Sequence, residues 1–260
     1  MKIGVFDSGL GGLIVTRAIR KMMPEYDYVY YGDTKRVPYG NKSNEAVFGF
    51  TKEAVDHLFE KENCAIVILA CNTASARALK QIQNLYLKEN KLDKKVLGVL
   101  IPAAEVASKY SRIGVIATRG TVASNTFPIE IMKLNNKVKV FQNPAPMLVP
   151  LIEEGENKRA KPFISEYLKP FENKNLDALV LGCTHYPMFK KEIKDQLPKS
   201  VKIISQDEIV PERLKDYLKR HTEISEKLSK GRSIKIITTD KAQNMDMIVK
   251  KWFGSTKNND

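Results

Sequence analysis

The chain carries the same order of strand-like runs twice, and this repetition restricts the folds that it can adopt. Residues 2–9 have a counterpart in residues 112–120, with an Ile-Gly-Val tripeptide at the same place in both. Further apolar runs follow in each half, at residues 26–31, 65–70 and 96–100, and at residues 137–141, 176–182 and 201–204. They alternate with predicted helices at residues 13–23, 45–60, 74–87, 162–171 and 190–197. Such alternation is typical of βαβ units on a parallel sheet. The repeat therefore predicts an α/β protein of two similar, pseudo-symmetric domains, each with a mostly parallel central sheet flanked by helices.

Each half also carries a cysteine directly after its third run. Cys71 follows residues 65–70 and Cys183 follows residues 176–182, both of which are apolar enough for strands buried on two faces. Ligands in parallel sheets bind outside the carboxyl ends of the strands. Polar side chains follow both cysteines, namely Asn72 and Thr73 in the first half and Thr184 and His185 in the second. Most free cysteines are small buried apolar residues, but two thiols in matching polar settings indicate a reaction with two opposite faces.

Composition limits the class of protein. The chain has 260 residues, of which 43% are hydrophobic and 28% charged, as in ordinary globular proteins. It holds no stretch near the ~20 apolar residues of a membrane span, and Met1 leads into a strand-like run. Three cysteines without disulfide or zinc spacing fit a reducing compartment. We therefore expect a cytoplasmic protein that does not enter a membrane, with Cys64 in a structural role.

The net charge of +13 is the one unusual value, and it has two interpretations. A basic protein on this scaffold could bind nucleic acid. However, acidic residues are interleaved with the lysines, and the sequence has no arginine stripe or aromatic-studded basic groove of the kind that stacks bases. We therefore expect no specific nucleic-acid binding. The excess positive charge would instead help to gather an anionic substrate.

The loop after the first strand places a carboxylate where the chemistry is expected. Its glycines, at positions 9, 11 and 12, depart from the dinucleotide-binding pattern, so we expect no nucleotide. Asp7 is either a partner of a nearby thiol or the N-cap of the next helix. His185 is either a structural histidine or a base for a thiol, whose unperturbed pKa near ~8.5 leaves little thiolate at neutral pH. Residues 38–40 after the second strand predict a turn and nothing more by themselves.

Taken in order, these motifs resemble those of the aspartate/glutamate racemase superfamily over nearly the full length of the chain. The resemblance rests on residues 7–9, 37–40, 70–74 and 181–187, and residues 148–155 extend it to the glutamate branch. It implies interconversion of L-glutamate and D-glutamate without a cofactor or metal, in which two cysteines flank the α-carbon and transfer protons. It also implies that the product supplies peptidoglycan synthesis, and that the protein is a homodimer.

The resemblance assigns a role to each motif residue. Cys71 and Cys183 become the base and the acid, with Cys71 facing the α-hydrogen of the D-isomer and Cys183 that of the L-isomer. Asp7 would support Cys71, while His185 and Glu153 would support Cys183. The remaining residues would bind substrate: Ser8, Asn72, Thr73 and Thr184 the α-amino and α-carboxylate groups, and Tyr39 and Gly40, behind Pro38, the side-chain carboxylate.

Some positions depart from the superfamily pattern and leave alternatives open. Ile101, Phe127 and Gln206 replace an acidic residue, a tyrosine and a glycine. Because Glu154 follows Glu153, either carboxylate could point inward. An aspartate or other amino-acid racemase is the alternative within the superfamily, although residues 31–40 favour glutamate.

The final part of the chain belongs to neither repeat. It contains a predicted helix at residues 211–218, with Pro211 in its first turn, a strand at residues 233–240 and a helix at residues 242–253. We expect this part to return to the first half. The predicted domains are therefore residues 1–99 with 212–260, which carry Cys71, and residues 100–211, which carry Cys183.

Overall fold

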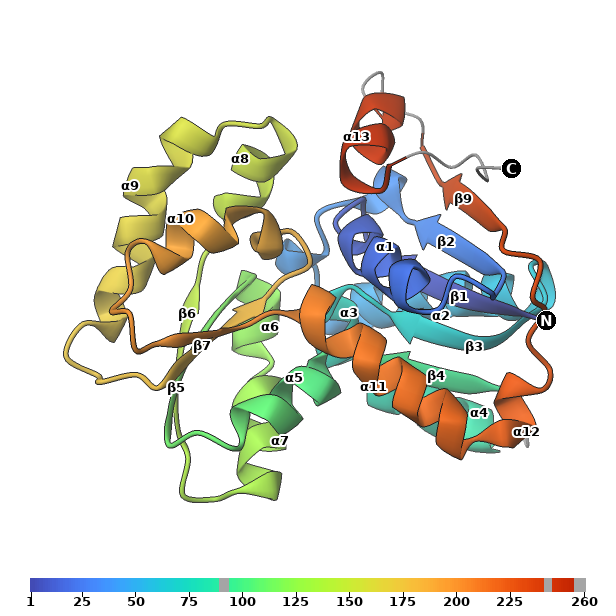
Figure 1. The fold of residues 1–260 in the computed structure, drawn as a ribbon, viewed down its shortest axis with the longest axis horizontal. Coiled ribbons are helices and arrows are strands. Elements are labelled where there is room, and N and C mark those ends of the chain that lie inside the picture. Colours follow the sequence, from blue (N-terminus) through green and yellow to red (C-terminus); the bar gives the residue numbers. More distant parts are fainter. Residues whose placement is uncertain (89–93, 241–244, 255–260) are drawn as a thin grey trace.

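The computed structural model describes residues 1–88, 94–240 and 245–254 and arranges its strands in two sheets (Figure 1). The first sheet has the order β4-β3-β1-β2-β9, from β1 (Lys2–Asp7), β2 (Tyr28–Gly32), β3 (Cys64–Leu69), β4 (Lys95–Gly98) and β9 (Ile234–Thr238). The second has the order β6-β5-β7-β8, from β5 (Arg112–Ala117), β6 (Lys139–Pro144), β7 (Ala178–Gly182) and β8 (Lys202–Ile204). All paired strands run parallel. The predicted α/β fold with two parallel sheets is confirmed.

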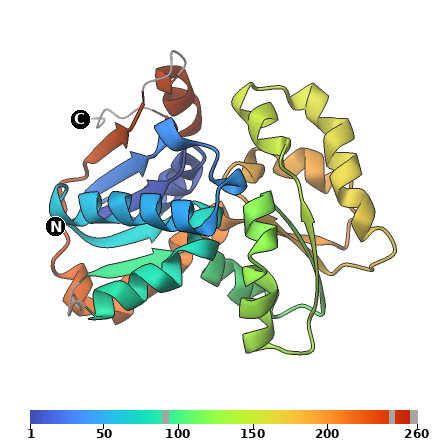
Figure 2. The same cartoon turned by 180° about the vertical axis from the view of Figure 1, so that it is seen from behind.

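Both sheets are covered by helices on both faces (Figures 1 and 2). The first sheet lies between α1 (Gly12–Met22) with α11 (Gln206–Arg220) and, on its other face, α2 (Asn44–Glu60), α3 (Asn72–Arg77) and α4 (Leu79–Lys88). The second is covered by α8 (Leu148–Glu153), α9 (Asn157–Leu168) and α10 (Lys190–Lys194), and on its other face by α5 (Leu100–Ala107), α6 (Arg119–Ala123) and α7 (Thr126–Leu134). Because no central strand faces water, strands such as β3 are apolar throughout.

The register of the sheets brings the predicted polar motifs together. In the first sheet β1 lies between β2 and β3, with Phe6 opposite Leu69 and Asp7 opposite Gly32. In the second sheet β5 lies between β6 and β7, with Ala117 opposite Gly182. The repeat-related strands therefore hold equivalent places in the two sheets, and the segments that carry the two cysteines leave them at equivalent ends.

Several helices differ from those predicted. The single helix expected at residues 74–87 is two helices, because Ala78, with φ of −116°, ends α3. The helix expected at residues 162–171 begins earlier, at Asn157. The helix expected from Pro211 likewise begins at Gln206, and both prolines lie inside their helices. In each case the hydrogen bond that proline cannot donate would reach only the second residue of the helix, so its loss is tolerated.

The last part of the chain returns to the first half, as expected. β9 pairs with β2, and α13 (Met245–Trp252) packs against α1. The start of the helix predicted at residues 242–253 lies outside the described residues. Short connections complete the structure: η1 (Thr34–Arg36), η2 (Tyr39–Asn41), η3 (Lys169–Phe171), η4 (Tyr186–Phe189) and α12 (Thr222–Ser225). Within the described ranges, no helix has the length and apolar character that a bilayer span requires.

Candidate active site

A cavity of about 380 Å³ lies between the two sheets, at the carboxyl ends of β1, β3, β5 and β7. It is lined by the predicted residues Ser8, Pro38, Tyr39, Gly40, Cys71, Asn72, Thr73, Glu153, Cys183, Thr184 and His185. Asp7 is the one predicted site residue outside this lining, and it is 1% exposed. Cys71 enters from the first sheet and Cys183 from the second, so the two thiols reach one cavity from opposite halves of the molecule.

Cys71 is held at the point where β3 gives way to α3. It is the N-cap of α3, and its sulfur accepts a hydrogen bond from the Ala74 amide at 3.5 Å. The thiol donates to the Ser8 hydroxyl at 3.3 Å. Burial raises the pKa of Cys71 to about 12, and the nearby Asp7 carboxylate adds to the shift. Cys71 is therefore a protonated thiol at neutral pH.

Asp7 joins the loop after β1 to the second half. Its carboxylate accepts hydrogen bonds from the Gly9 amide at 3.1 Å and from the Thr184 hydroxyl at 3.5 Å. Burial raises the pKa of Asp7, although the positive charge of His185 opposes this shift. The N-cap of α1 is Gly11, so Asp7 does not cap that helix. The carboxylate is instead part of a buried network that reaches Thr184, the residue next to Cys183.

The Cys183 side has a different set of partners. His185 Nδ1 lies 3.8 Å from the Cys183 sulfur, and His185 Nε2 lies 3.0 Å from Glu153 Oε1. Burial alone would lower the pKa of His185, but hydrogen bonds with Cys183 and Glu153 outweigh it and raise that pKa to about 10. Trp252 packs edge-on against the imidazole with ring centroids 5.5 Å apart. An imidazolium in this place can exchange a proton with Cys183, and Glu153 is the carboxylate that orients it.

The residues expected to bind substrate lie on both sides of the cavity. Tyr39 is 1% exposed and donates its hydroxyl hydrogen to Asp33 at 2.5 Å. At Gly40 a Cβ atom would lie 2.9 Å from Thr118 Cβ, so the η2 turn rests directly against the second half. The Thr73 and Thr118 hydroxyl oxygens are 2.9 Å apart. These contacts close one end of the cavity.

Sequence reasoning missed several residues at this site. Thr118 and Arg119 line the cavity, and the Asn72 side chain donates to Gln206 Oε1 at 2.7 Å. The repeat could have indicated Thr118, because it follows β5 as Ser8 follows β1. In the sequence, Gln206 stands out only as a departure from a superfamily pattern. Its contact with Asn72 depends on how the two halves are placed, which no local pattern reveals.

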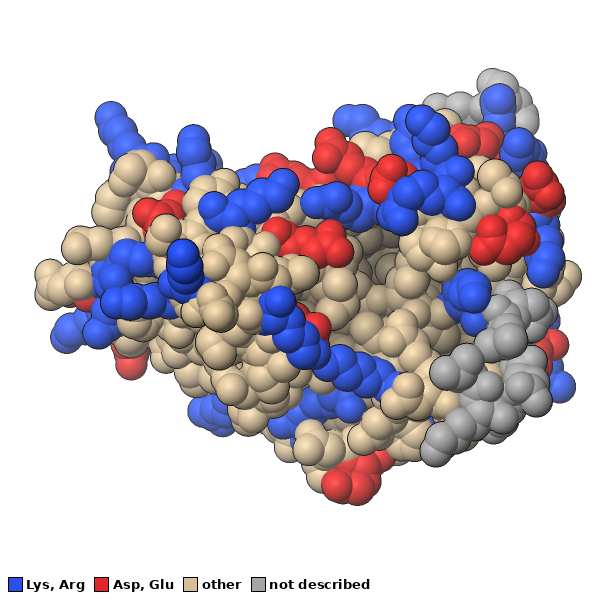
Figure 3. Space-filling view, turned by 90° about the horizontal axis from the view of Figure 1, so that it is seen from below, with Lys and Arg blue, Asp and Glu red and all other residues tan. Residues whose placement is uncertain are grey.

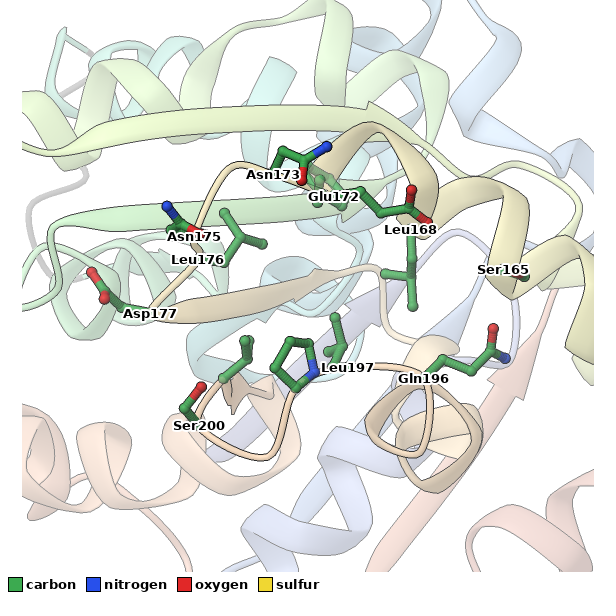
Figure 4. Close-up of a pocket in the computed structure, with 13 residues that line it drawn as sticks. Ser165, Leu168, Glu172, Asn173, Asn175, Leu176, Asp177, Gln196, Leu197 and Ser200 are labelled. Atoms are coloured by element: carbon green, nitrogen blue, oxygen red, sulfur yellow. The ribbon is translucent and has the colours of Figure 1, made fainter.

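Other surface features lie apart from this cavity. A larger one, of about 680 Å³, opens at the amino ends of β7 and β8, between a loop with Asn173 and Asp177 and a loop with Ser200 (Figure 4). None of the predicted site residues lines it.

Lys and Arg side chains are spread over the face shown in Figure 3, with Asp and Glu between them. In the part of the chain that the structure describes, no group of three or more His, Cys, Asp or Glu side chains could hold a metal ion.

Comparison with known proteins identifies the family. A family model described as Asp/Glu/Hydantoin racemase matches residues 3–209. The chain belongs to the Asp/Glu/Hydantoin racemase family. Among curated members, glutamate racemase from Aquifex aeolicus is 38% identical over 98% of this chain and 94% of its own length.

Solved structures from this racemase family have the same fold. Glutamate racemase from Francisella tularensis, in complex with D-glutamate, has a TM-score of 0.89 and 31% identity, covering 99% of this chain and 95% of its own. A glutamate racemase isoform from Bacillus anthracis has a TM-score of 0.88 and 33% identity, covering 98% and 94%. Racemisation requires a proton to leave one face of a carbon and another to arrive on the opposite face. A cavity that is lined by a thiol from each half of the molecule therefore bears directly on how a member of a racemase family works.

Proposed function

We propose that this protein interconverts L-glutamate and D-glutamate by direct proton transfer at the α-carbon, with Cys71 and Cys183 as the two bases and without cofactor or metal. The observation that carries the proposal is that both thiols line one cavity, each from a different sheet. One thiolate removes the α-proton while the opposite thiol delivers a proton to the other face. A hydroxyl is too weak a base at neutral pH, whereas a desolvated thiolate is strong enough and is readily reprotonated.

The partners of the two thiols support a division of roles. With L-glutamate, Cys183 takes the α-proton and Cys71 gives one, and with D-glutamate the roles exchange. The resting protonation suits the first direction, because Cys71 is a thiol and an imidazolium stands beside Cys183. Asp7 supports Cys71, while His185 and Glu153 support Cys183.

The polar lining of the cavity supports binding of a dicarboxylic amino acid. The α-amino and α-carboxylate groups of the substrate would be held by side-chain hydroxyl and amide groups in the lining of the cavity. These groups belong to Ser8, Asn72, Thr73 and Thr184. The η2 turn, with Tyr39 and Gly40 behind Pro38, would hold the side-chain carboxylate. The cavity of about 380 Å³ is within the range of small-molecule sites.

The wider role follows from the reaction. We place the protein in the cytoplasm, as the supplier of D-glutamate for peptidoglycan. Its two domains would be residues 1–99 with 212–260 and residues 100–211, one around each sheet.

We also propose a homodimer, supported by the exposed apolar side chains of Ile129, Met132 and Leu134 on α7. On the face shown in Figure 3, acidic side chains lie between the basic ones, which supports the absence of a specific nucleic-acid site there.

Circular dichroism of the substrate tests the reaction. Protein dialysed against a chelator is incubated with L-glutamate or D-glutamate, with no cofactor added. Either signal should decay to zero, because the two enantiomers are equally stable and reach equal amounts. L-Aspartate serves as the matched substrate and should react far more slowly. Activity that returns only with a metal or pyridoxal phosphate would contradict the cofactor-free mechanism, and faster reaction of aspartate would contradict the substrate.

A further inference from the structure

Arg77, the last residue of α3, joins three segments around one end of the cavity. Its Nε donates to the backbone carbonyl of Gly120 in α6 at 3.1 Å. Its Nη1 donates to the carbonyl of Lys42, which ends the η2 turn, at 2.6 Å. One partly buried side chain of the first half therefore holds both a turn that lines the cavity and a helix of the second half.

An arginine is suited to this junction for a physical reason. The guanidinium is a planar fork with five N–H donors in fixed directions, so a single group can serve two carbonyls that approach from different sides. Charge-assisted hydrogen bonds of this kind are stronger than neutral ones. A lysine would offer a point charge on a flexible stem and would not fix two carbonyls in the same way.

The backbones that Arg77 joins are in close contact. A Cβ atom at Gly120 would lie 2.9 Å from the Gly40 carbonyl oxygen and 3.1 Å from Arg77 Cζ. A Cβ atom at Gly40 would lie 2.9 Å from Thr118 Cβ. The turn and α6 therefore meet without side chains between them, and Arg77 braces the place where they meet. If the guanidinium were lost, both carbonyls would lose their charged donor, and the turn would no longer be tied to α6 through Arg77.

We propose that Arg77 is a positioning residue for substrate selectivity: its guanidinium fixes the η2 turn against α6 and so fixes Tyr39 and Gly40 at the end of the cavity that receives the side-chain carboxylate. This inference rests on the proposed function. Arg77 is not among the residues that line the cavity, so it acts through the turn. Because the turn serves the distal carboxylate and not the α-carbon, loss of Arg77 weakens substrate binding more than proton transfer.

Steady-state kinetics in the circular dichroism assay tests this role with Arg77→Met and Arg77→Lys. Arg77→Met should raise KM for L-glutamate roughly 10- to 100-fold with kcat within about threefold of the parent, because the binding that is lost is made equally in the ground state and in the transition state. It should also narrow the preference for glutamate over aspartate. Arg77→Lys should give an intermediate KM. The matched control is Arg112→Met at the start of β5, because Arg112 also donates to a backbone carbonyl, that of Lys174. The Arg112→Met variant should keep the KM of the parent.

Each other outcome counts against the proposal. An unchanged KM in Arg77→Met, even with a lowered melting temperature, would make Arg77 a structural residue only. A fall in kcat at constant KM would place its effect at the α-carbon instead. If Arg77→Met does not fold, Arg77→Lys decides, and a parental KM in that variant overturns the inference. Failure of the proposed function is distinguishable, because the unmodified protein would then not racemise glutamate at all.

Discussion

Cys71 and Cys183 hold repeat-related positions, yet their surroundings have diverged. Cys71 donates to the Ser8 hydroxyl and is buried as a thiol, whereas the Cys183 sulfur has an imidazole 3.8 Å away. The repeat-related partner of His185 is Thr73, which contacts the Thr118 hydroxyl instead of a thiol. The two cysteines therefore have different partners, although the strands that precede them are related by the repeat.

Replacing either cysteine should stop racemisation and leave a one-base reaction. In Cys71→Ser or Cys183→Ser, one face of the α-carbon lacks a competent acid or base, so we expect a loss of at least 10²–10⁴-fold, the contribution of general acid–base catalysis. Elimination of HCl from a chlorinated glutamate analogue needs one base and should survive for one enantiomer in each variant. Cys64→Ser is the control, because Cys64 is buried at the start of β3 and does not line the cavity. Near-normal racemisation by either active-site variant would contradict the two-base mechanism.

The imidazole beside Cys183 should make stability depend on pH. The pKa of His185 is raised from its ordinary value of ~6.5 to about 10, so the folded state holds the proton more tightly than the unfolded state. This contribution is complete below about pH 6.5 and is lost as the pH rises through about 10. The difference in unfolding free energy between the parent and His185→Asn, measured with denaturant, should therefore shrink over that window. Glu153→Gln removes one cause of the raised pKa of His185, so it should narrow the pH range over which this difference shrinks. A difference in unfolding free energy that does not depend on pH would contradict the raised pKa of His185.

Among the secondary-structure elements, the loop between β1 and α1 packs closely against the segment that follows β7. A Cβ atom at Gly11 would collide with His185 Nδ1 and would lie 2.5 Å from Thr184 Oγ1. The φ of Gly11 is −58°, which any residue can adopt, so the glycine is required by space and not by backbone conformation. The start of a helix in the first half therefore sets the positions of side chains in the second.

Gly11→Ala should reduce activity although it replaces no proposed catalytic residue. The added methyl group must push His185 and Thr184 away, and a displacement of about 1 Å can cost roughly 10²-fold in rate. The control is Gly49→Ala in α2, where nothing lies within 4 Å of the new Cβ atom. That variant should keep full activity and gain about 0.5–1 kcal/mol of stability, because alanine is the better helix former. Equal activity in the two variants would show that the cavity tolerates the displacement.

Elements with strong periodic signals were predictable from the sequence, and the contacts between them were not. The apolar run before Cys71 identifies β3, and residues 45–60 identify α2 almost to its ends. Short helices such as α5 and α7 were not predicted, because each has a proline in its first turn and few residues from which to judge a period. Local pattern could place the thiols at strand ends, but not the Arg77 and Gln206 contacts that cross between halves.

Two features of the molecule would attract an anionic substrate, namely its net charge of +13 and a single arginine in the lining of the cavity. Arg119 is the one lysine or arginine among the residues that line it, and it is exposed. The summed field of a basic protein attracts a dicarboxylic substrate, and an exposed cation in the lining of the cavity adds to this attraction locally. Such attraction is screened over ~10 Å at 0.1 M salt.

Arg119→Gln should lower kcat/KM for L-glutamate roughly three- to tenfold at low ionic strength, as the loss of a steering charge does. The deficit should shrink as salt is raised, because screening removes the same attraction from the parent. Lys199→Gln removes the same charge from an exposed position in the loop before β8, among residues that do not line the cavity, and should follow the parent at every salt concentration. If Arg119→Gln and Lys199→Gln lose equal amounts, net charge alone attracts the substrate. If Arg119→Gln loses activity equally at all salt concentrations, its guanidinium contacts the bound substrate directly, and the steering argument is wrong.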